Sequence, residues 1–141
     1  MYAKQIGAYQ KSDVLTADPM RLVLMCYNAT IKNLKLAKTK YQEKEFEAKG
    51  KAVQKAVDVI SELIMGLDYE KGGNISKNLD ALYRYMIRQI NLADVKEDLS
   101  GFDEVIDMLI ELEDAWKQAV AGKRKTIDTI DEGRKQAGAW A

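Results

Sequence analysis

The chain has 141 residues, 47% of them hydrophobic and 31% charged, and its 22 basic residues balance its 22 acidic ones. This length and balance indicate one globular domain with a sizeable core, and the lack of net charge provides no overall field to attract nucleic acid or an anionic membrane. Histidine is absent, which removes the commonest general base and transition-metal ligand, so we expect no catalysis, no metal and no cofactor.

The N-terminal residues 1–17 form an arm that is too apolar for a solvated tail and too short for an independent unit. Its first part, Met1 to Gln10, lacks the apolar centre of a signal peptide. No hydrophobic run in the sequence approaches the roughly 20 residues of a membrane span. We therefore expect a cytoplasmic protein without membrane insertion, whose arm packs on the domain that follows.

The first predicted helix runs from Pro19 to about Tyr41. Asp18 is a favourable N-cap residue, and proline is favoured at the first helical position. The apolar residues recur at helical spacing on a face wide enough to pack between two neighbours: Leu22, Val23, Cys26, Tyr27, Ala29, Ile31, Leu34 and Ala37. Cys26 is the only cysteine of the chain, and its apolar neighbours predict a buried structural thiol.

The second predicted helix runs from about Glu45 to Leu67 and has the same period of 3.6 residues. Its apolar stripe consists of Val53, Ala56, Val57, Ile60, Leu63, Ile64 and Leu67. The next segment, Asp68 to Gly73, contains the only Gly-Gly pair of the chain and is predicted to be a turn or loop.

The third predicted helix, Asn74 to Asp94, carries two neighbouring uncharged stripes where a bundle helix needs one. The first stripe spans roughly 100° of the helix and is predicted to face the core. It consists of Ile75, Leu79, Leu82, Tyr83, Met86, Ile90 and Ala93. The second stripe lies beside Leu82 and consists of Asn78, Tyr85, Gln89 and Leu92. An uncharged strip beside the edge of a core predicts a surface that can hold a partner peptide.

A fourth helix is predicted after the connection Val95 to Leu99, with the hydroxyl of Ser100 as its cap. Its core stripe consists of Val105, Leu109, Leu112, Trp116 and Val120. We expect this helix to stop at Gly122. Residues 123–141 form a tail, for which a short helical extension and a frayed end both remain open.

These patterns predict an all-α protein, an antiparallel four-helix bundle over residues 18–122 with the N-terminal arm packed on it. The short connections favour the antiparallel order, because each helix can then bury its stripe against two others. No segment has the pattern of a glycine-rich phosphate loop, so nucleotide chemistry is not expected.

Four spaced motifs in this order resemble the flagellar export chaperone family known as FliS, the cytoplasmic chaperone of flagellin. They are Thr16 to Asn28, Lys55 to Leu63 followed by Gly66 to Asp68, Gly72 to Met86, and Leu109 to Trp116. The most specific part is Asn-Leu-x-x-Leu-Tyr-x-Tyr-Met, which begins at Asn78. Three positions depart from the family pattern: Asp18 replaces serine, Cys26 replaces leucine and Asn28 replaces aspartate. The tail beyond Gly122 has no counterpart in the resemblance.

The resemblance implies an antiparallel bundle that binds the C-terminal segment of flagellin, prevents premature polymerisation and assists delivery to the flagellar export apparatus. Other flagellar regulators are further partners that it suggests. An end segment of flagellin forms helices only when their apolar faces are buried, and a bundle with spare apolar grooves supplies that burial. An alternative is a regulatory adaptor that uses the same groove for a different protein client.

We predict a client-binding groove made by Asn78, Leu82, Tyr85, Gln89 and Leu92, with Leu82 on the boundary between core and surface. Amide side chains can pair with client backbone groups, and tyrosine offers apolar area with a hydroxyl at its tip. A plainer alternative is that the arm or a second copy of the chain covers this stripe. In the family that the chain resembles, the N-terminal segment can lie over part of the client surface. Ile6 and Tyr9 are therefore candidates for a removable lid, and simple anchoring of the arm is the alternative.

Overall fold

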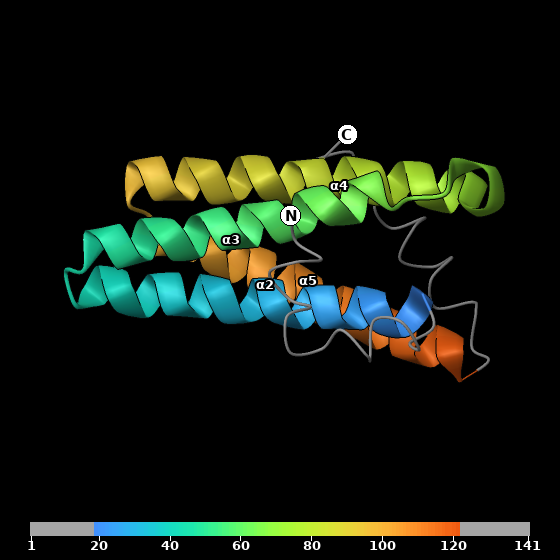
Figure 1. The fold of residues 1–141 in the computed structure, drawn as a ribbon, viewed down its shortest axis with the longest axis horizontal. Coiled ribbons are helices and arrows are strands. Elements are labelled where there is room, and N and C mark those ends of the chain that lie inside the picture. The colour runs from blue at the N-terminus through green and yellow to red at the C-terminus, as the bar shows by residue number, and fades with distance from the viewer. Residues whose placement is uncertain (1–18, 122–141) are drawn as a thin grey trace.

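The computed structural model describes residues 19–121, which form four antiparallel helices (Figure 1). The helices are α2 (Pro19–Gln42), α3 (Phe46–Met65), α4 (Tyr69–Lys96) and α5 (Leu99–Val120). The predicted all-α bundle is therefore confirmed. The N-terminal arm with Ile6 and Tyr9, the cap residue Asp18, and the chain from Gly122 onward lie outside the described residues.

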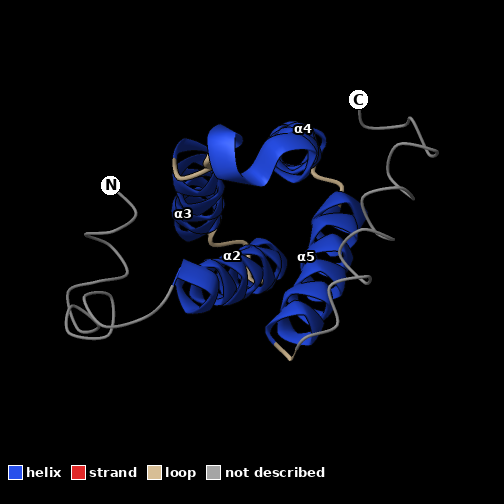
Figure 2. Cartoon of the chain, turned by 90° about the vertical axis from the view of Figure 1, so that its right-hand side faces the viewer, coloured by secondary structure: helices blue, strands red, loops and turns tan. Residues whose placement is uncertain are grey.

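The helices are arranged as a ring around one core, which is clear in the view along the bundle (Figure 2). Each helix packs against its neighbour in sequence, and α5 closes the ring by packing against α2. Within residues 19–121, no helix combines the length and the apolar character that crossing a bilayer requires.

The core contains residues from the predicted stripes of all four helices. Its largest fully buried side chains are Tyr27, Leu34, Val59, Ile60, Leu82, Tyr83, Met86, Ile90, Phe102, Val105 and Leu109. Cys26 is buried as expected, and its thiol donates to the carbonyl oxygen of Leu22 at 3.0 Å. The contribution of α5 is wider than predicted, since Phe102, Ile106 and Met108 are also buried.

The connection between α3 and α4 differs from the predicted loop. Helix α4 begins at Tyr69, so most of the segment Asp68 to Gly73 is helical, and the chain leaves helical geometry only at Gly73, with φ 52° and ψ −124°. The side chain of Asp68 accepts from the backbone N–H of Lys71 at 3.0 Å and caps the new helix. The Asp68 carboxylate therefore stabilises the first turn of α4, although two adjacent glycines lie at its end.

The connection between α4 and α5 is shorter than predicted, because α4 continues to Lys96 and α5 begins at Leu99. Glu97 adopts a left-handed conformation with φ 56°, which ends α4 as a C-cap glycine or asparagine would. The cap of α5 is Asp98 and not Ser100, since the Asp98 carboxylate accepts from the Ser100 backbone N–H at 3.1 Å. Ser100 lies in the first turn of α5.

Candidate functional site

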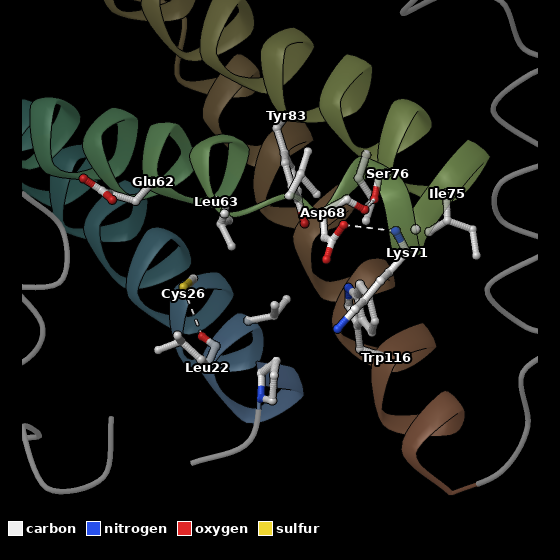
Figure 3. A pocket seen from close by; sticks show the side chains of 16 residues that line it. Leu22, Cys26, Glu62, Leu63, Asp68, Lys71, Ile75, Ser76, Tyr83 and Trp116 are labelled. Atoms are coloured by element: carbon white, nitrogen blue, oxygen red, sulfur yellow. Dashed lines mark hydrogen bonds between the residues drawn. The ribbon is translucent and has the colours of Figure 1, made fainter. Parts of the chain in front are cut away.

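An apolar pocket of about 400 Å³ lies at the end of the bundle where α2 and α4 begin and α3 and α5 end (Figure 3). We call this end the pocket end. The pocket is lined by Pro19, Leu22, Val23, Cys26, Glu62, Leu63, Gly66, Leu67, Asp68, Lys71, Gly72, Ile75, Ser76, Leu79, Tyr83 and Trp116. All four helices contribute to this set.

The apolar lining comes from the helix turns near the pocket end. There the apolar stripes of the helices extend beyond the fully buried core. Cys26 and Leu63 are buried, whereas Leu22, Leu67 and Ile75 are only half-buried. Half-buried aliphatic side chains around a concavity leave apolar surface in contact with water, and covering it with another apolar group is favourable by about 25 cal/mol per Å². The pocket is therefore suited to an apolar ligand surface.

The first turn of α4 forms one rim of the pocket, because Gly73 lets the chain change direction. A Cβ atom at Gly72 would lie 1.9 Å from the Ser76 hydroxyl oxygen, so the turn packs closely on the helix that follows. The Ser76 hydroxyl donates to the carbonyl oxygen of Asp68 at 2.8 Å, and Ser76 is buried. This hydrogen bond ties the start of the turn to the body of α4 and holds Lys71 at the rim.

One wall of the pocket is aromatic and is fixed by a chain of hydrogen bonds. The indole Nε1–H of Trp116 on α5 donates to the Tyr27 hydroxyl on α2 at 2.8 Å. The hydroxyls of Tyr27 and Tyr83 share a hydrogen bond of 2.5 Å, and their rings meet edge to face with centroids 6.2 Å apart. Trp116 was predicted to be core, but its side chain is half-buried and faces the pocket.

The polar groups at the pocket are few and lie toward its rim. Asp68 and Lys71 are exposed and Glu62 is half-buried. The described residues bring together no group of three histidine, cysteine or carboxylate side chains that could hold a metal ion. A concave apolar surface with a few peripheral charges can bind and orient an apolar segment.

The predicted groove lies on another face of α4, and no member of it lines the pocket. Asn78, Tyr85 and Gln89 are half-buried, and Leu92 is 47% exposed. Leu82 is only 1% exposed, so its predicted position on the boundary between core and surface is wrong. A client could not touch Leu82 without opening the core.

Helix α5 covers part of this predicted stripe. A Cβ atom at Gly101 would lie 2.5 Å from the Cβ atom of Ala93 and 3.7 Å from the carbonyl oxygen of Gln89, so the two helices approach closely there. The Tyr85 hydroxyl donates to the Glu104 carboxylate at 2.9 Å. Burial, and then this carboxylate, raise the pKa of Tyr85 above its usual value. Part of the second uncharged stripe of α4 therefore packs against α5.

The apolar stripes of the sequence predict core positions for Leu22, Ile75, Leu79 and Trp116, whereas these residues line the pocket. A signal for the pocket was nevertheless present. Pro19 and the Gly72–Gly73 pair interrupt or begin helices at the same end of an antiparallel bundle. Where helices begin or are interrupted at one end of a bundle, the apolar stripes of the other helices have fewer side chains packed against them.

The sequence is similar to a known family and to several characterised proteins. The family model "Flagellar protein FliS" matches residues 2–123. The flagellar secretion chaperone FliS of Salmonella typhimurium is 38% identical over 121 residues, which cover 82% of this chain and 90% of the relative. The proteins of the same name from Bacillus subtilis and Escherichia coli are 36% and 32% identical, over 84% and 89% of this chain and 87% and 92% of their own lengths.

Proposed function

Because the chain belongs to the FliS family of flagellar secretion chaperones, we propose that it binds the C-terminal segment of flagellin. The family is one of chaperones and not of enzymes, in agreement with the prediction of no catalysis. Binding in the cytoplasm would keep flagellin from polymerising before export and would present it to the flagellar type III export apparatus.

The observation that carries the proposal is the apolar pocket of about 400 Å³ at the pocket end of the bundle. A terminal segment of flagellin that is unfolded in the monomer can form amphipathic helix only where its apolar face is buried. The half-buried side chains of Leu22, Leu67 and Ile75 offer such burial. Folding of the client on binding consumes part of the contact energy, which leaves a complex that can be released at export.

The outer stripe of α4 is a second contact region in this proposal. Asn78, Tyr85, Gln89 and Leu92 keep partial or full exposure, so a long client segment that starts in the pocket can continue along α4. The guanidinium of Arg88 lies 5.9 Å from the centroid of the Tyr85 ring, which fixes one side of that ring. Leu82 supports this surface from the core and is not itself a contact.

The N-terminal arm is proposed as a removable cover. The arm joins α2 at Pro19, and Pro19 lines the pocket. The apolar residues Ile6 and Tyr9 precede Pro19 by 13 and 10 residues in the sequence, and Pro19 belongs to the surface that the client needs. Competition between arm and client would make release easier, because the arm can cover the apolar surface that the departing client exposes.

The experiment is calorimetric titration of the full chain with the C-terminal segment of flagellin from the same organism, with circular dichroism before and after mixing. We expect one-to-one binding and a gain in helix. The variant Ile75→Glu should weaken binding by roughly tenfold or more, because it places a charge among apolar lining side chains. The matched variant Val95→Glu changes the same kind of residue on the same helix, but Val95 is 80% exposed and lies away from the pocket, so affinity should not change.

The outer stripe has its own variant, Tyr85→Asp. Unchanged affinity in a fully helical Tyr85→Asp protein would remove the stripe from the client surface and leave the pocket. A folded wild-type chain that does not bind the flagellin segment would instead favour the adaptor alternative with a different protein client.

A further inference from the structure

The buried hydroxyl of Tyr27 joins two side chains that face the pocket, although Tyr27 does not line the pocket itself. Tyr83 and Trp116 are lining residues, and both form hydrogen bonds with the Tyr27 hydroxyl, at 2.5 and 2.8 Å. Tyr27 is 0% exposed and Tyr83 is 1% exposed. These three residues come from α2, α4 and α5, so one hydroxyl ties together three of the four helices directly behind the wall.

Such a junction has a cost that a purely structural core would avoid. A buried hydroxyl must be hydrogen-bonded, and loss of one partner leaves the other groups with unmet polar atoms. Phenylalanine at these positions would fill nearly the same space with no polar atom to satisfy. The hydroxyls do provide directional bonds, and these fix the orientation of the Trp116 indole ring and of the Tyr83 ring relative to the pocket.

We propose that Tyr27 is a positioning residue that holds Trp116 and Tyr83 as a preformed aromatic wall, against which an apolar side chain of the client packs. The inference rests on the proposed function, since it concerns the same pocket. A wall that is rigid before binding does not have to be ordered when the client arrives, and preorganisation of this kind strengthens binding without adding contacts. The wall would also favour client side chains that fit a fixed surface, namely flat or branched apolar groups.

The test uses the full chain with Tyr27→Phe, which keeps the ring in the core and removes the junction. A matched control is Thr30→Val, which also removes a buried hydroxyl of α2. The Thr30 hydroxyl is 0% exposed and donates only to the Cys26 carbonyl oxygen of its own helix, at 2.9 Å. Tyr83→Phe is a second variant, which removes the bond between the two tyrosine hydroxyls and keeps the bond from Trp116 to Tyr27.

Two measurements are made on each variant. The first is affinity for the C-terminal flagellin segment, which should fall about fivefold in Tyr27→Phe, the equivalent of one ordinary hydrogen bond, and less in Tyr83→Phe. The second is the fluorescence anisotropy decay of Trp116 without client, in a background with Trp140→Phe so that Trp116 is the sole tryptophan. Tyr27→Phe should add a fast local motion of the indole ring, and Thr30→Val should change neither measurement.

The outcomes distinguish the positioning role of Tyr27 from the proposed chaperone function. Binding by the wild-type chain together with equal affinity in Tyr27→Phe, or an equal loss in Thr30→Val, would overturn the positioning role and leave the chaperone function intact. An unchanged anisotropy decay in Tyr27→Phe would also overturn it. Absence of wild-type binding would overturn the proposed function, and the anisotropy decay would then decide by itself whether Tyr27 fixes the wall.

Discussion

The two ends of the bundle are held together by different kinds of contact. At the pocket end, three helices are joined by the buried hydroxyl of Tyr27, and the Ser76 hydroxyl ties the start of α4 to the rest of that helix. At the opposite end, which we call the far end, exposed or half-buried ion pairs link neighbouring helices. There α2 and α4 end and α3 and α5 begin.

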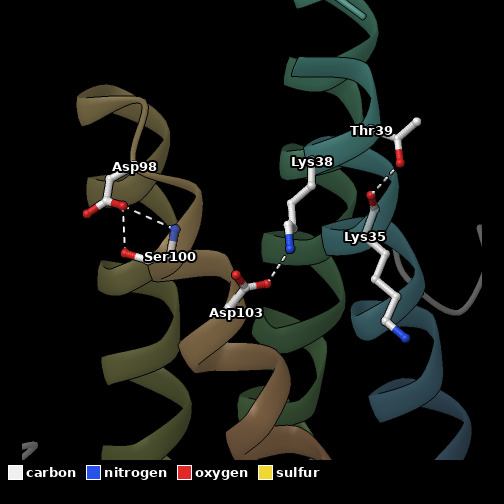
Figure 4. A network of polar contacts seen from close by, with 6 residues as sticks. All are labelled: Lys35, Lys38, Thr39, Asp98, Ser100 and Asp103. Carbon is white, nitrogen blue, oxygen red and sulfur yellow. Dashed lines mark hydrogen bonds and ion pairs between the residues drawn. The ribbon is translucent and has the colours of Figure 1, made fainter. Parts of the chain in front are cut away.

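The far end is closed by charge pairs and by close backbone approach. Lys49 on α3 pairs with Asp94 on α4 at 2.5 Å, and Lys38 on α2 pairs with Asp103 on α5 at 2.5 Å. Figure 4 shows the second pair beside the Asp98 cap of α5. An exposed ion pair contributes little, typically about 0–1 kcal/mol, and Lys49–Asp94 is the more buried of these two pairs. The pairs fix the register between helices, and the close approach of α4 and α5 at Gly101 adds packing at the same end.

The pocket end instead contains the features that a simple bundle does not need. It has an apolar concavity and a polar junction inside the core. Such features lower stability and persist where another requirement keeps them. The difference supports the proposal that the client binds at the pocket end, with the far end serving mainly stability.

The largest expected effect comes from a change at the far end, Gly101→Val. A Cβ atom there would lie 2.5 Å from the Ala93 Cβ atom, so α4 and α5 must separate, and the free energy of unfolding should fall by about 2–3 kcal/mol. Denaturant unfolding followed by circular dichroism measures this loss. Gly50→Ala is the control, because nothing lies within 4 Å of its Cβ position and alanine should stabilise the helix by about 0.5–1 kcal/mol.

The same Gly101→Val protein tests the division between the two ends. At a temperature where it is fully folded, its affinity for the flagellin segment should match that of the wild type. Weaker binding in proportion to lost stability would show that the ends are not separate in function.

A smaller loss of stability and a clear loss of binding are expected from Gly73→Ala at the pocket end. The methyl group of alanine would not clash with any neighbour, since nothing lies within 4 Å of the Cβ position. Alanine is strained at this backbone conformation, which should cost about 1–2 kcal/mol or force the first turn of α4 to move. Gly66→Ala is a matched control at the same pocket, because Gly66 has an ordinary φ of −86° and its Cβ position makes only normal contacts. Equal client affinity in the two variants would contradict a role for the turn.

The sequence was sufficient to predict the four helices and the core stripes, since periodicity depends only on which side of each helix is buried. It misplaced Leu82, because the width of a buried face depends on how near the neighbouring helix comes. That distance depends on residues of other helices, as the close approach of Gly101 on α5 to Ala93 on α4 illustrates. A helical wheel of α4 alone does not contain this information.

The pocket could not be predicted for a related reason. Ile75, Leu79 and Trp116 belong to apolar stripes, and a stripe shows that a side chain faces inward without showing whether anything covers it. The helical turn at the start of α4 could not be predicted either, because two adjacent glycines have a low helix propensity and favour a loop. The Asp68 cap and the bond from the Ser76 hydroxyl to the Asp68 carbonyl oxygen make this turn helical, and only the second glycine leaves helical geometry.

The smallest expected effect is a pH dependence at the far end that does not reach the pocket. The hydroxyl of Ser100, and then its backbone N–H, hold the pKa of Asp98 below its ordinary value of 3.8. Because the pKa is lower in the folded chain, ionised Asp98 favours folding above the ordinary value, and this contribution is lost as the pH falls through the lower folded value. Asn at this position keeps a cap without the charge.

Asp98→Asn should therefore have nearly the stability of the wild type at neutral pH and lose less stability in acid, over the window just below pH 3.8. Thermal unfolding of both proteins across that window measures the difference, and other carboxylates cancel in the comparison. If the unfolding temperatures of the two proteins change with pH in parallel, the contacts with Ser100 stabilise the charged and the neutral cap equally. Flagellin affinity at neutral pH should be the same in both proteins, because Asp98 caps α5 at the end of the bundle opposite the pocket.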